Sequence, residues 1–312
     1  MRAVWSFWSR PRNVKRGHAW LAERFHLFSW ALSLQTARRH YPSTALVTDS
    51  EGARMLVDGL GLEFASVSTS LDALEGSDPS MWALGKLYAY RQQTEPFVHV
   101  DSDVYLWSPL PERIRTAPVF TQNPEPLNED TFFYRPQLVE NAMLSPPGGW
   151  VPAEWSWFLR SGIKLRGECC GIFGGCDLDF IRHYAEQAIT LVEHPENRRR
   201  WLELPYRELD MISVEQYLLA ACLEHHARTP GSRFTGVRVE HLFESVYHAY
   251  TPGSAVEAGY THLIAGVKGE APVMARLEAR MARDYPAAYE RCLRYARDHG
   301  LEPGAEPIGR AA

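Results

Sequence analysis

The chain has 312 residues, 45% of them hydrophobic, and a formal net charge of -5, so it can bury a substantial core. The acidic balance offers no basic surface for nucleic acid, and no stretch reaches the roughly 18 apolar residues of a membrane span. The N-terminal segment also lacks the apolar run of a signal peptide, so we expect a cytoplasmic protein without a transmembrane segment.

The first hundred residues alternate between β-prone runs and segments with apolar residues at helical spacing. We expect strands at 2–8, 44–49, 63–68 and 96–103, and helices at 18–40, 51–61 and 81–93. This alternation is typical of a parallel α/β sheet, so the sequence predicts a mixed, mainly parallel sheet flanked by helices.

Residues 109–162 are rich in proline and aromatic side chains and poor in periodicity, which predicts long loops packed over the sheet. A glycine-flanked strand from residue 171 then leads into a helix capped by Asp177. A helix at 213–227, a strand within 260–269 and a helical tail follow. No internal repeat and no long linker separates independent domains.

The five cysteines are an odd number in a fairly large chain, which argues against a secreted disulfide framework. The stretch CCGIFGGC holds Cys169, Cys170 and Cys176, but adjacent cysteines rarely serve one tetrahedral zinc site and no His-x-x-x-His accompanies them. We therefore expect these thiols to be small buried apolar side chains.

Two aspartates, Asp101 and Asp103, end the fourth expected strand in the stretch FVHVDSDVYLW. Ligands of open α/β sheets bind outside the carboxyl ends of strands. Two carboxylates one residue apart can reach one divalent cation if the backbone turns between them, and such oxygen ligands suit Mg²⁺ or Mn²⁺. The alternative is a solvated turn, against which the apolar residues on both sides argue.

This stretch resembles the Asp-x-Asp motif of nucleotide-sugar-dependent glycosyltransferases with the GT-A fold. The resemblance covers the order of elements over residues 1–270 and implies a Rossmann-like GT-A domain there. It divides that domain into a nucleotide-sugar-binding half, 1–108, and an acceptor-side half, 109–270, followed by a C-terminal helical tail, 271–312. It also implies Mn²⁺ (or Mg²⁺) on Asp101 and Asp103, with Ser102 beside the donor.

The stretch THLIAGVKG resembles the His-x-x-Gly-x-x-Lys motif of glycosyltransferase family 8 and related bacterial glycosyltransferase-like proteins. The resemblance implies that His262 is the third metal ligand and that Gly266 and Lys268 meet the donor pyrophosphate. One extra residue separates the histidine from the glycine, and Gly269 stands where proline is usual. These two departures from the motif weaken the match more at the lysine than at the histidine. The alternative for His262 is a packed core histidine.

Glu215 and Gln216 resemble the acidic residue and glutamine that begin a family 8 helix near the acceptor and reacting sugar, although glutamate replaces the usual aspartate. The alternative is that they simply open a helix, where an acid favours the dipole. The small-residue strand before them, with Gly174 and Gly175, either admits the sugar or forms a bend.

Four more residues are candidate donor contacts, each with a structural alternative. Lys86 lies on the helix before the metal strand and is otherwise a surface lysine. Asp49 ends the second strand and is otherwise a helix N-cap. Gln122 and Asn123 follow the metal strand and otherwise form a turn.

The resemblance implies a hexosyltransferase-like enzyme that moves sugar from a nucleoside diphosphate sugar to a saccharide, peptide or small-molecule acceptor. Transfer retains configuration if the family 8 chemistry holds, and an inverting reaction would need a base, for which Glu215 is the first candidate. A metal-dependent nucleotidyltransferase or phosphoesterase, or a non-catalytic nucleotide-sugar-binding protein, are the alternatives. We also expect Trp150 or Trp155 to be partly exposed on the acceptor side.

Overall fold

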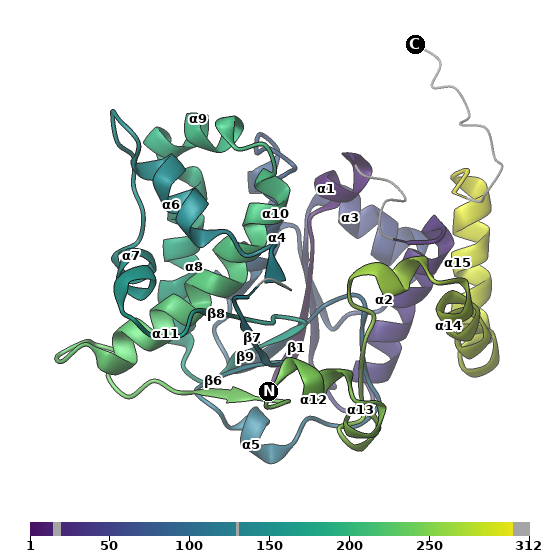
Figure 1. The fold of residues 1–312 in the computed structure, drawn as a ribbon. Coiled ribbons are helices and arrows are strands. Elements are labelled where there is room, and N and C mark those ends of the chain that lie inside the picture. The colour runs from purple at the N-terminus through teal and green to yellow at the C-terminus, as the bar shows by residue number, and fades with distance from the viewer. Residues whose placement is uncertain (15–19, 129–130, 302–312) are drawn as a thin grey trace, which may run out of the picture.

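A seven-stranded sheet forms the centre of the computed structural model, which describes residues 1–14, 20–128 and 131–301 (Figure 1). Its strand order is β10-β6-β9-β4-β1-β2-β3. These strands are β1 (Arg2–Phe7), β2 (Thr44–Thr48), β3 (Ser66–Ser68), β4 (Phe97–Val100), β6 (Val119–Thr121), β9 (Ile172–Gly175) and β10 (Val239–His241). β9 runs antiparallel to both of its neighbours, β4 and β6, and the other neighbouring pairs are parallel. The sheet is therefore mixed and mainly parallel, as predicted.

Two small antiparallel sheets lie beside the main one. One pairs β5 (Val104–Leu106) with β11 (Tyr260–His262), and the other pairs β7 (Pro124–Pro126) with β8 (Arg166–Glu168). The first of these sheets joins the segment after β4 to a segment near the C-terminus, and this pairing positions the candidate site.

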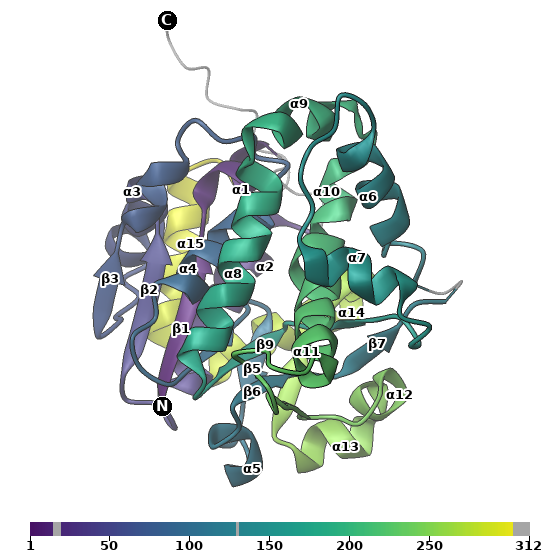
Figure 2. The ribbon, with the colours of Figure 1, turned by 90° about the vertical axis from the view of Figure 1, so that its left-hand side faces the viewer.

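Helices cover both faces of the sheet (Figures 1 and 2). On one face lie α2 (Glu23–Ala37), α14 (Ala271–Asp284) and α15 (Pro286–Asp298), which pack on one another. On the other lie α4 (Ala83–Arg91), α8 (Leu178–Glu193), the π-helical turn η4 (Ser213–Tyr217) and α11 (Leu218–Arg228). The described residues also form the helices and helical turns α1 (Ser9–Val14), α3 (Ser50–Ala53), η1 (Arg54–Gly59), η2 (Ser70–Leu74), α5 (Glu112–Arg115), α6 (Pro136–Leu144), α7 (Ala153–Arg160), α9 (Pro195–Glu203), α10 (Arg207–Ile212), α12 (Val246–Tyr250), α13 (Pro252–Glu257) and η5 (Ala265–Gly269).

The apolar core has two parts, one on each face of the sheet. Successive strand residues point to opposite faces, so the β1 residue Val4 joins one cluster while its neighbour Trp5 joins the other. The first cluster includes the fully buried Phe173 and Tyr184, and the second includes Phe28 under the C-terminal helices. Removing this much apolar surface from water is the main source of stability for such a layered fold.

Residues 109–162 do not form long loops, and that expectation was wrong. Strands β6 and β7 and helices α5, α6 and α7 all fall in this segment. Pro136 occupies the first turn of α6, and Pro152 directly precedes α7. Proline at a helix start lacks only an N–H that has no helical partner anyway, so these prolines mark helix starts, which a proline-rich composition conceals.

The other expected elements are present, with ends that differ from the predicted ones by a few residues. Asp177 caps α8, since its carboxylate accepts a hydrogen bond from the backbone N–H of Phe180 at 3.0 Å. The first two residues of the predicted helix at 18–40 lie outside the described residues. The end of the predicted helical tail, after residue 301, also lies outside them. Within the described part of the chain, every helix falls short of the length or apolar character that crossing a membrane requires.

Candidate functional site

The segment that follows β4 turns back on itself and brings both aspartates to the same edge of the sheet. The Asp101 N–H donates to the Gly171 carbonyl at 3.0 Å, and the Asp101 carbonyl accepts from Val104 N–H at 3.0 Å. β5 then pairs with β11 in a register that sets Val104 opposite His262. Asp101, Asp103 and His262, which are far apart in sequence, therefore meet at the carboxyl end of a buried strand.

These three side chains form a cluster that fits a divalent cation. One carboxylate oxygen of each aspartate and a ring nitrogen of His262 all lie within 4.8 Å of one another. His262 Nε2 lies 3.5 Å from Asp103 Oδ1. Two carboxylates with one imidazole are a donor set that suits Mn²⁺, and the carboxylates alone suit Mg²⁺.

Gln122 fixes the ring of His262 for this role. Its side-chain carbonyl accepts hydrogen bonds from His262 Nδ1 at 2.7 Å and from the Tyr260 hydroxyl at 2.6 Å. With its proton on Nδ1, the imidazole directs the Nε2 lone pair toward Asp103, as a metal-ligating histidine does. A Cβ on Gly171 would lie 2.6 Å from His262 Nδ1 and 2.5 Å from Gln122 Oε1, so any larger residue there would displace these two side chains.

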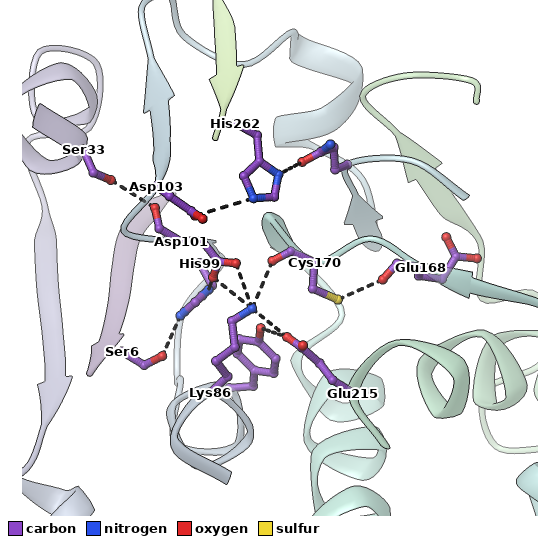
Figure 3. Close-up of polar contacts among 12 residues, drawn as sticks. Ser6, Ser33, Lys86, His99, Asp101, Asp103, Glu168, Cys170, Glu215 and His262 are labelled. Atoms are coloured by element: carbon purple, nitrogen blue, oxygen red, sulfur yellow. Dashed lines mark hydrogen bonds and ion pairs between the residues drawn. The ribbon is translucent and has the colours of Figure 1, made fainter. Parts of the chain in front are cut away.

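Lys86 lies between Asp101 and Glu215 beneath the cluster (Figure 3). Its Nζ is 2.9 Å from Asp101 Oδ1 and 2.8 Å from Glu215 Oε1, and the Tyr90 hydroxyl donates to the same glutamate oxygen at 3.2 Å. Glu215 is fully buried, and the Lys86 side chain is 14% exposed. Burial alone would lower the pKa of Lys86, but the charges of Asp101 and Glu215 outweigh it and raise that pKa. Lys86 is thus a buried counter-ion, which the sequence alone does not indicate.

The two aspartates have opposite electrostatic surroundings. Burial raises the pKa of Asp101 to about 6, although Lys86 opposes the shift. Burial would also raise the pKa of Asp103, but its ion pair with Lys268 and the neighbouring His262 hold that pKa well below the ordinary value. With all groups ionised, three carboxylates face two ammonium groups, and one negative charge remains uncompensated. The site therefore attracts a cation.

A cavity of about 240 Å³ opens beside the carboxylates. Lys86, Asp101, Ser102 and Asp103 form its polar side, and its aromatic wall consists of Phe7, Trp8, His26, Trp30 and Trp82. A larger cavity of about 1020 Å³ lies between α1, α3 and α15, but none of the cluster residues lines it. We take the smaller cavity as the candidate ligand site because the charged groups face it.

Asp49 is placed as a helix cap. One of its carboxylate oxygens accepts from the Gly52 N–H at 2.7 Å, and the other accepts from the backbone N–H and hydroxyl of Ser9 at 2.9 and 2.8 Å. Both oxygens thus have structural partners, which agrees with the N-cap alternative.

Asn123 and Gln216 also have protein partners. Asn123 is buried and its side-chain amide donates to the Pro124 carbonyl at 3.2 Å, while the Gln216 side-chain carbonyl accepts from the Tyr134 hydroxyl. Gly266 lies in η5 beside Lys268 and has open space around it.

The aromatic and glycine candidates lie away from the cavity. Trp155 is fully buried and donates from its ring to the Pro136 carbonyl at 3.2 Å, whereas Trp150 is half-buried and stacks on the His194 ring. Neither lines the 240 Å³ cavity. A Cβ on Gly174 would lie 2.0 Å from the Phe97 carbonyl oxygen, and a Cβ on Gly175 would lie 2.0 Å from the Pro118 carbonyl oxygen. These glycines therefore allow close packing within the sheet.

The cysteines Cys169, Cys170, Cys222 and Cys292 are buried, but Cys176 is exposed, so the expectation of a buried side chain was wrong for Cys176. Neither of the two candidate metal clusters found among the described residues includes a cysteine.

Comparison with protein families gives a match that spans residues 1–295. The chain belongs to the family of unknown function DUF6734. Comparison with curated proteins finds no match. The match to DUF6734 covers the whole candidate site, from the β1 strand to Lys268, and its description assigns no activity.

Sequence reasoning missed two residues that shape the site of this DUF6734 protein. Tyr90 contacts Glu215, as described above, and His99 lies 3.7 Å from Asp101 Oδ1 through Nδ1 and 2.9 Å from the Ser6 hydroxyl through Nε2. The sequence does indicate that His99 lies near Asp101, because residues two apart on a strand share a face. No local pattern indicates Tyr90, which meets Glu215 only through packing of α4 against η4.

Proposed function

We propose that this protein is a divalent-cation-dependent glycosyltransferase that takes a nucleoside diphosphate sugar as donor. The observation that carries the proposal is the meeting of Asp101, Asp103, His262 and Lys268 at one strand end. The two aspartates and the histidine offer oxygen and nitrogen ligands to a cation. The fourth residue, Lys268, places an ammonium group beside them. A mainly parallel sheet with this cluster at the carboxyl end of β4 is also what a GT-A fold requires.

The charges of the site fit a cation together with a diphosphate. A cation bound to Asp101, Asp103 and His262 would neutralise the negative charge that develops on the departing nucleoside diphosphate. Lys268 is close enough to Asp103 to meet the same phosphates. Lys86 holds the Asp101 carboxylate in place and reduces its charge, while Gln122 orients His262. Each residue thus has a binding or orienting role.

The aromatic wall of the adjacent cavity suits the base or sugar of a nucleotide. Trp8, Trp30 and Trp82 line the cavity beside the carboxylates, and aromatic side chains pack well on flat or apolar ring surfaces. We assign the donor to this cavity, with Ser102 at its rim near the phosphates.

Glu215 and Gln216 occupy the helical turn that precedes α11. The Glu215 carboxylate contacts Lys86 through Oε1, and its buried Oε2 has no hydrogen-bond partner among the described residues. A buried carboxylate oxygen without a protein partner is suited to accept a hydrogen bond from a donor hydroxyl. Because Glu215 Oε1 is already paired with Lys86, we assign Glu215 a binding role and propose the retaining outcome, which needs no enzymic base.

The first experiment is a thermal-shift screen of nucleotide sugars with and without Mn²⁺. We expect at least one donor to raise the melting temperature only when Mn²⁺ is present. Asp103→Asn should weaken that binding at least ~100-fold, since even second-shell changes around metals cost roughly 10- to 100-fold. The exposed Asp179, whose side chain is 84% exposed, gives the matched control Asp179→Asn, which should behave as the parent protein.

The products of donor turnover distinguish the alternatives. A glycosyltransferase releases the nucleoside diphosphate, whereas a nucleotidyltransferase or phosphoesterase releases the monophosphate. A non-catalytic binding protein shows Mn²⁺-dependent binding and no turnover in any acceptor screen. Donor binding that is equally strong in Asp103→Asn would overturn the assignment of this cluster as the donor site.

A further inference from the structure

A second cluster of metal-binding side chains lies outside the site described above. Glu154 on α7, His183 on α8 and His226 on α11 point toward one another, and these three helices lie side by side (Figure 2). His183 Nε2 is 2.8 Å from Glu154 Oε1, His226 Nε2 is 3.3 Å from the same oxygen, and the two Nε2 atoms are 3.1 Å apart. One oxygen and two nitrogens therefore form a nearly equilateral triangle.

The size of this triangle is that of one face of a metal coordination shell. Ligand atoms about 2.0–2.1 Å from a zinc ion at tetrahedral angles lie about 3.3 Å from one another. Two imidazoles and one carboxylate are also a ligand set found in zinc sites that leave the fourth position to water.

Hydrogen bonding alone does not satisfy the three contacts. A neutral imidazole carries one proton, and the Glu154 carboxylate only accepts. If both Nε2 atoms carry protons, both donate to Glu154 and the 3.1 Å contact sets two N–H groups against each other. If only one Nε2 carries a proton, the other directs its lone pair at the Glu154 oxygen. A cation at the centre of the triangle resolves all three contacts together.

The surroundings hold the ligands in place and exclude most solvent. The three side chains are 8–13% exposed, and the Phe234 ring packs against both imidazoles at centroid distances of 5.2 and 5.1 Å. The Ser232 hydroxyl lies 2.7 Å from His226 Nδ1, where an acceptor fixes the tautomer of a metal ligand. Arg233 donates to His183 Nδ1 at 3.0 Å, so metal binding at Nε2 requires this exposed guanidinium to withdraw.

We propose that Glu154, His183 and His226 bind a divalent transition-metal ion of the zinc class, at a site independent of the Asp101, Asp103 and His262 cluster. Such an ion joins α7, α8 and α11. The turn η4, which carries Glu215, continues directly into α11. The second metal therefore has a structural role, since it anchors the helix that positions a residue of the candidate donor site.

Zinc uptake by the chelator-treated full chain tests this proposal. The test uses Asp103→Asn, so that the first cluster does not contribute, with zinc measured by elemental analysis after gel filtration. We expect one zinc ion per chain and a melting temperature raised by about 4 °C at zinc concentrations 100 times Kd. This protein keeps all three proposed zinc ligands, so absence of stoichiometric zinc uptake overturns the proposal.

Changes to the ligands give a second test on the same background. Glu154→Gln and His226→Gln, checked for folding by circular dichroism, should each weaken zinc binding at least tenfold. His248→Gln, at an exposed histidine outside the cluster, should leave the affinity unchanged. Arg233→Ala should bind zinc at least as tightly as its parent, because the competing donor to His183 is gone. Undiminished affinity in either ligand variant, or weaker affinity in Arg233→Ala, contradicts the proposed ligand set.

Discussion

Replacing Lys86 with methionine tests whether the buried lysine holds the candidate site together. Lys86→Met keeps most of the side-chain volume but removes the charge shared by Asp101 and Glu215. Two carboxylates then remain at the bottom of the site without their counter-ion. Burial of an unpaired charge is strongly unfavourable, so we expect the variant to fold with a large loss of stability.

The contact distances set the size of this loss. At 2.8–2.9 Å each ion pair has an attraction of about 6 kcal/mol at an effective dielectric constant of ~20. Desolvation of the ammonium offsets much of it, and removing one partner of a buried pair costs about 3–5 kcal/mol in measured cases. An unfolding entropy of about 2.1 cal/mol/K per residue converts this to a melting temperature lower by roughly 5–8 °C.

Thermal and urea unfolding of Lys86→Met at several pH values measures the effect. Lys164→Met is the matched control, since Lys164 is exposed, and it should change stability by no more than ~0.5 kcal/mol. Loss of the Lys86 charge removes the influence that opposes the burial-raised pKa of Asp101, so the penalty is full at neutral pH and shrinks as acidification protonates this carboxylate. A loss as small as that of Lys164→Met, or a loss that grows toward acid pH, would refute the reasoning.

Two further changes address stability elsewhere in the fold. Burial alone would raise the pKa of Glu168, but its hydrogen bond from His241 and the charge of Arg166 hold it below the ordinary 4.5, so its contribution is present above that pH and lost below it. Glu168→Gln should therefore cost about 3–5 kcal/mol at pH 7 in urea unfolding, and its difference from the wild type should shrink below pH 4.5. Trp155→Ala should cost about 3–5 kcal/mol, because the ring is fully buried. Replacement of the half-buried Trp150 by alanine should lower the free energy of unfolding by less, and equal losses of stability in the two variants would contradict this ranking.

The sequence predicts the first half of the sheet and the two aspartates for one physical reason. β1, β2 and β4 are mostly buried and mainly apolar, and an aspartate directly after β2 and after β4 marks the end of each of these two strands. Because parallel strands end at one edge, the sequence alone assigns Asp101 and Asp103 to that edge. The function that this edge performs stays a prediction.

Contacts between helices could not be predicted in the same way. Lys86 and Glu215 meet only because α4 packs against η4, and nothing near either residue in sequence indicates the other. The cluster of Glu154, His183 and His226 draws one residue from each of three helices, without the short spacing by which a metal motif is recognised. The antiparallel insertion of β9 between β4 and β6 likewise depends on tertiary packing.

The two lysines of the site have different partners, and this leads to a prediction for Lys268. Lys86 is fixed within α4 by contacts to Asp101 and Glu215, whereas Lys268 reaches Asp103 from the 3-10 turn η5, with its ammonium 5.4 Å from the Trp20 ring centroid. A cation at Asp103 must share that carboxylate with Lys268 or displace it. The displaced ammonium is then available to the donor diphosphate.

Lys268→Met should therefore have opposite effects on the two ligands. Mn²⁺ alone should bind more tightly, because a competing positive charge is gone, while the donor in saturating Mn²⁺ should bind roughly 10- to 100-fold more weakly, as expected for a lost charged hydrogen bond. Titration calorimetry with each ligand, and with Lys164→Met as control, measures both. Weaker Mn²⁺ binding would mean that Lys268 supports the arrangement of the cluster and does not compete with the cation. An unchanged donor affinity would remove Lys268 from the diphosphate site and leave charge neutralisation there to the cation alone.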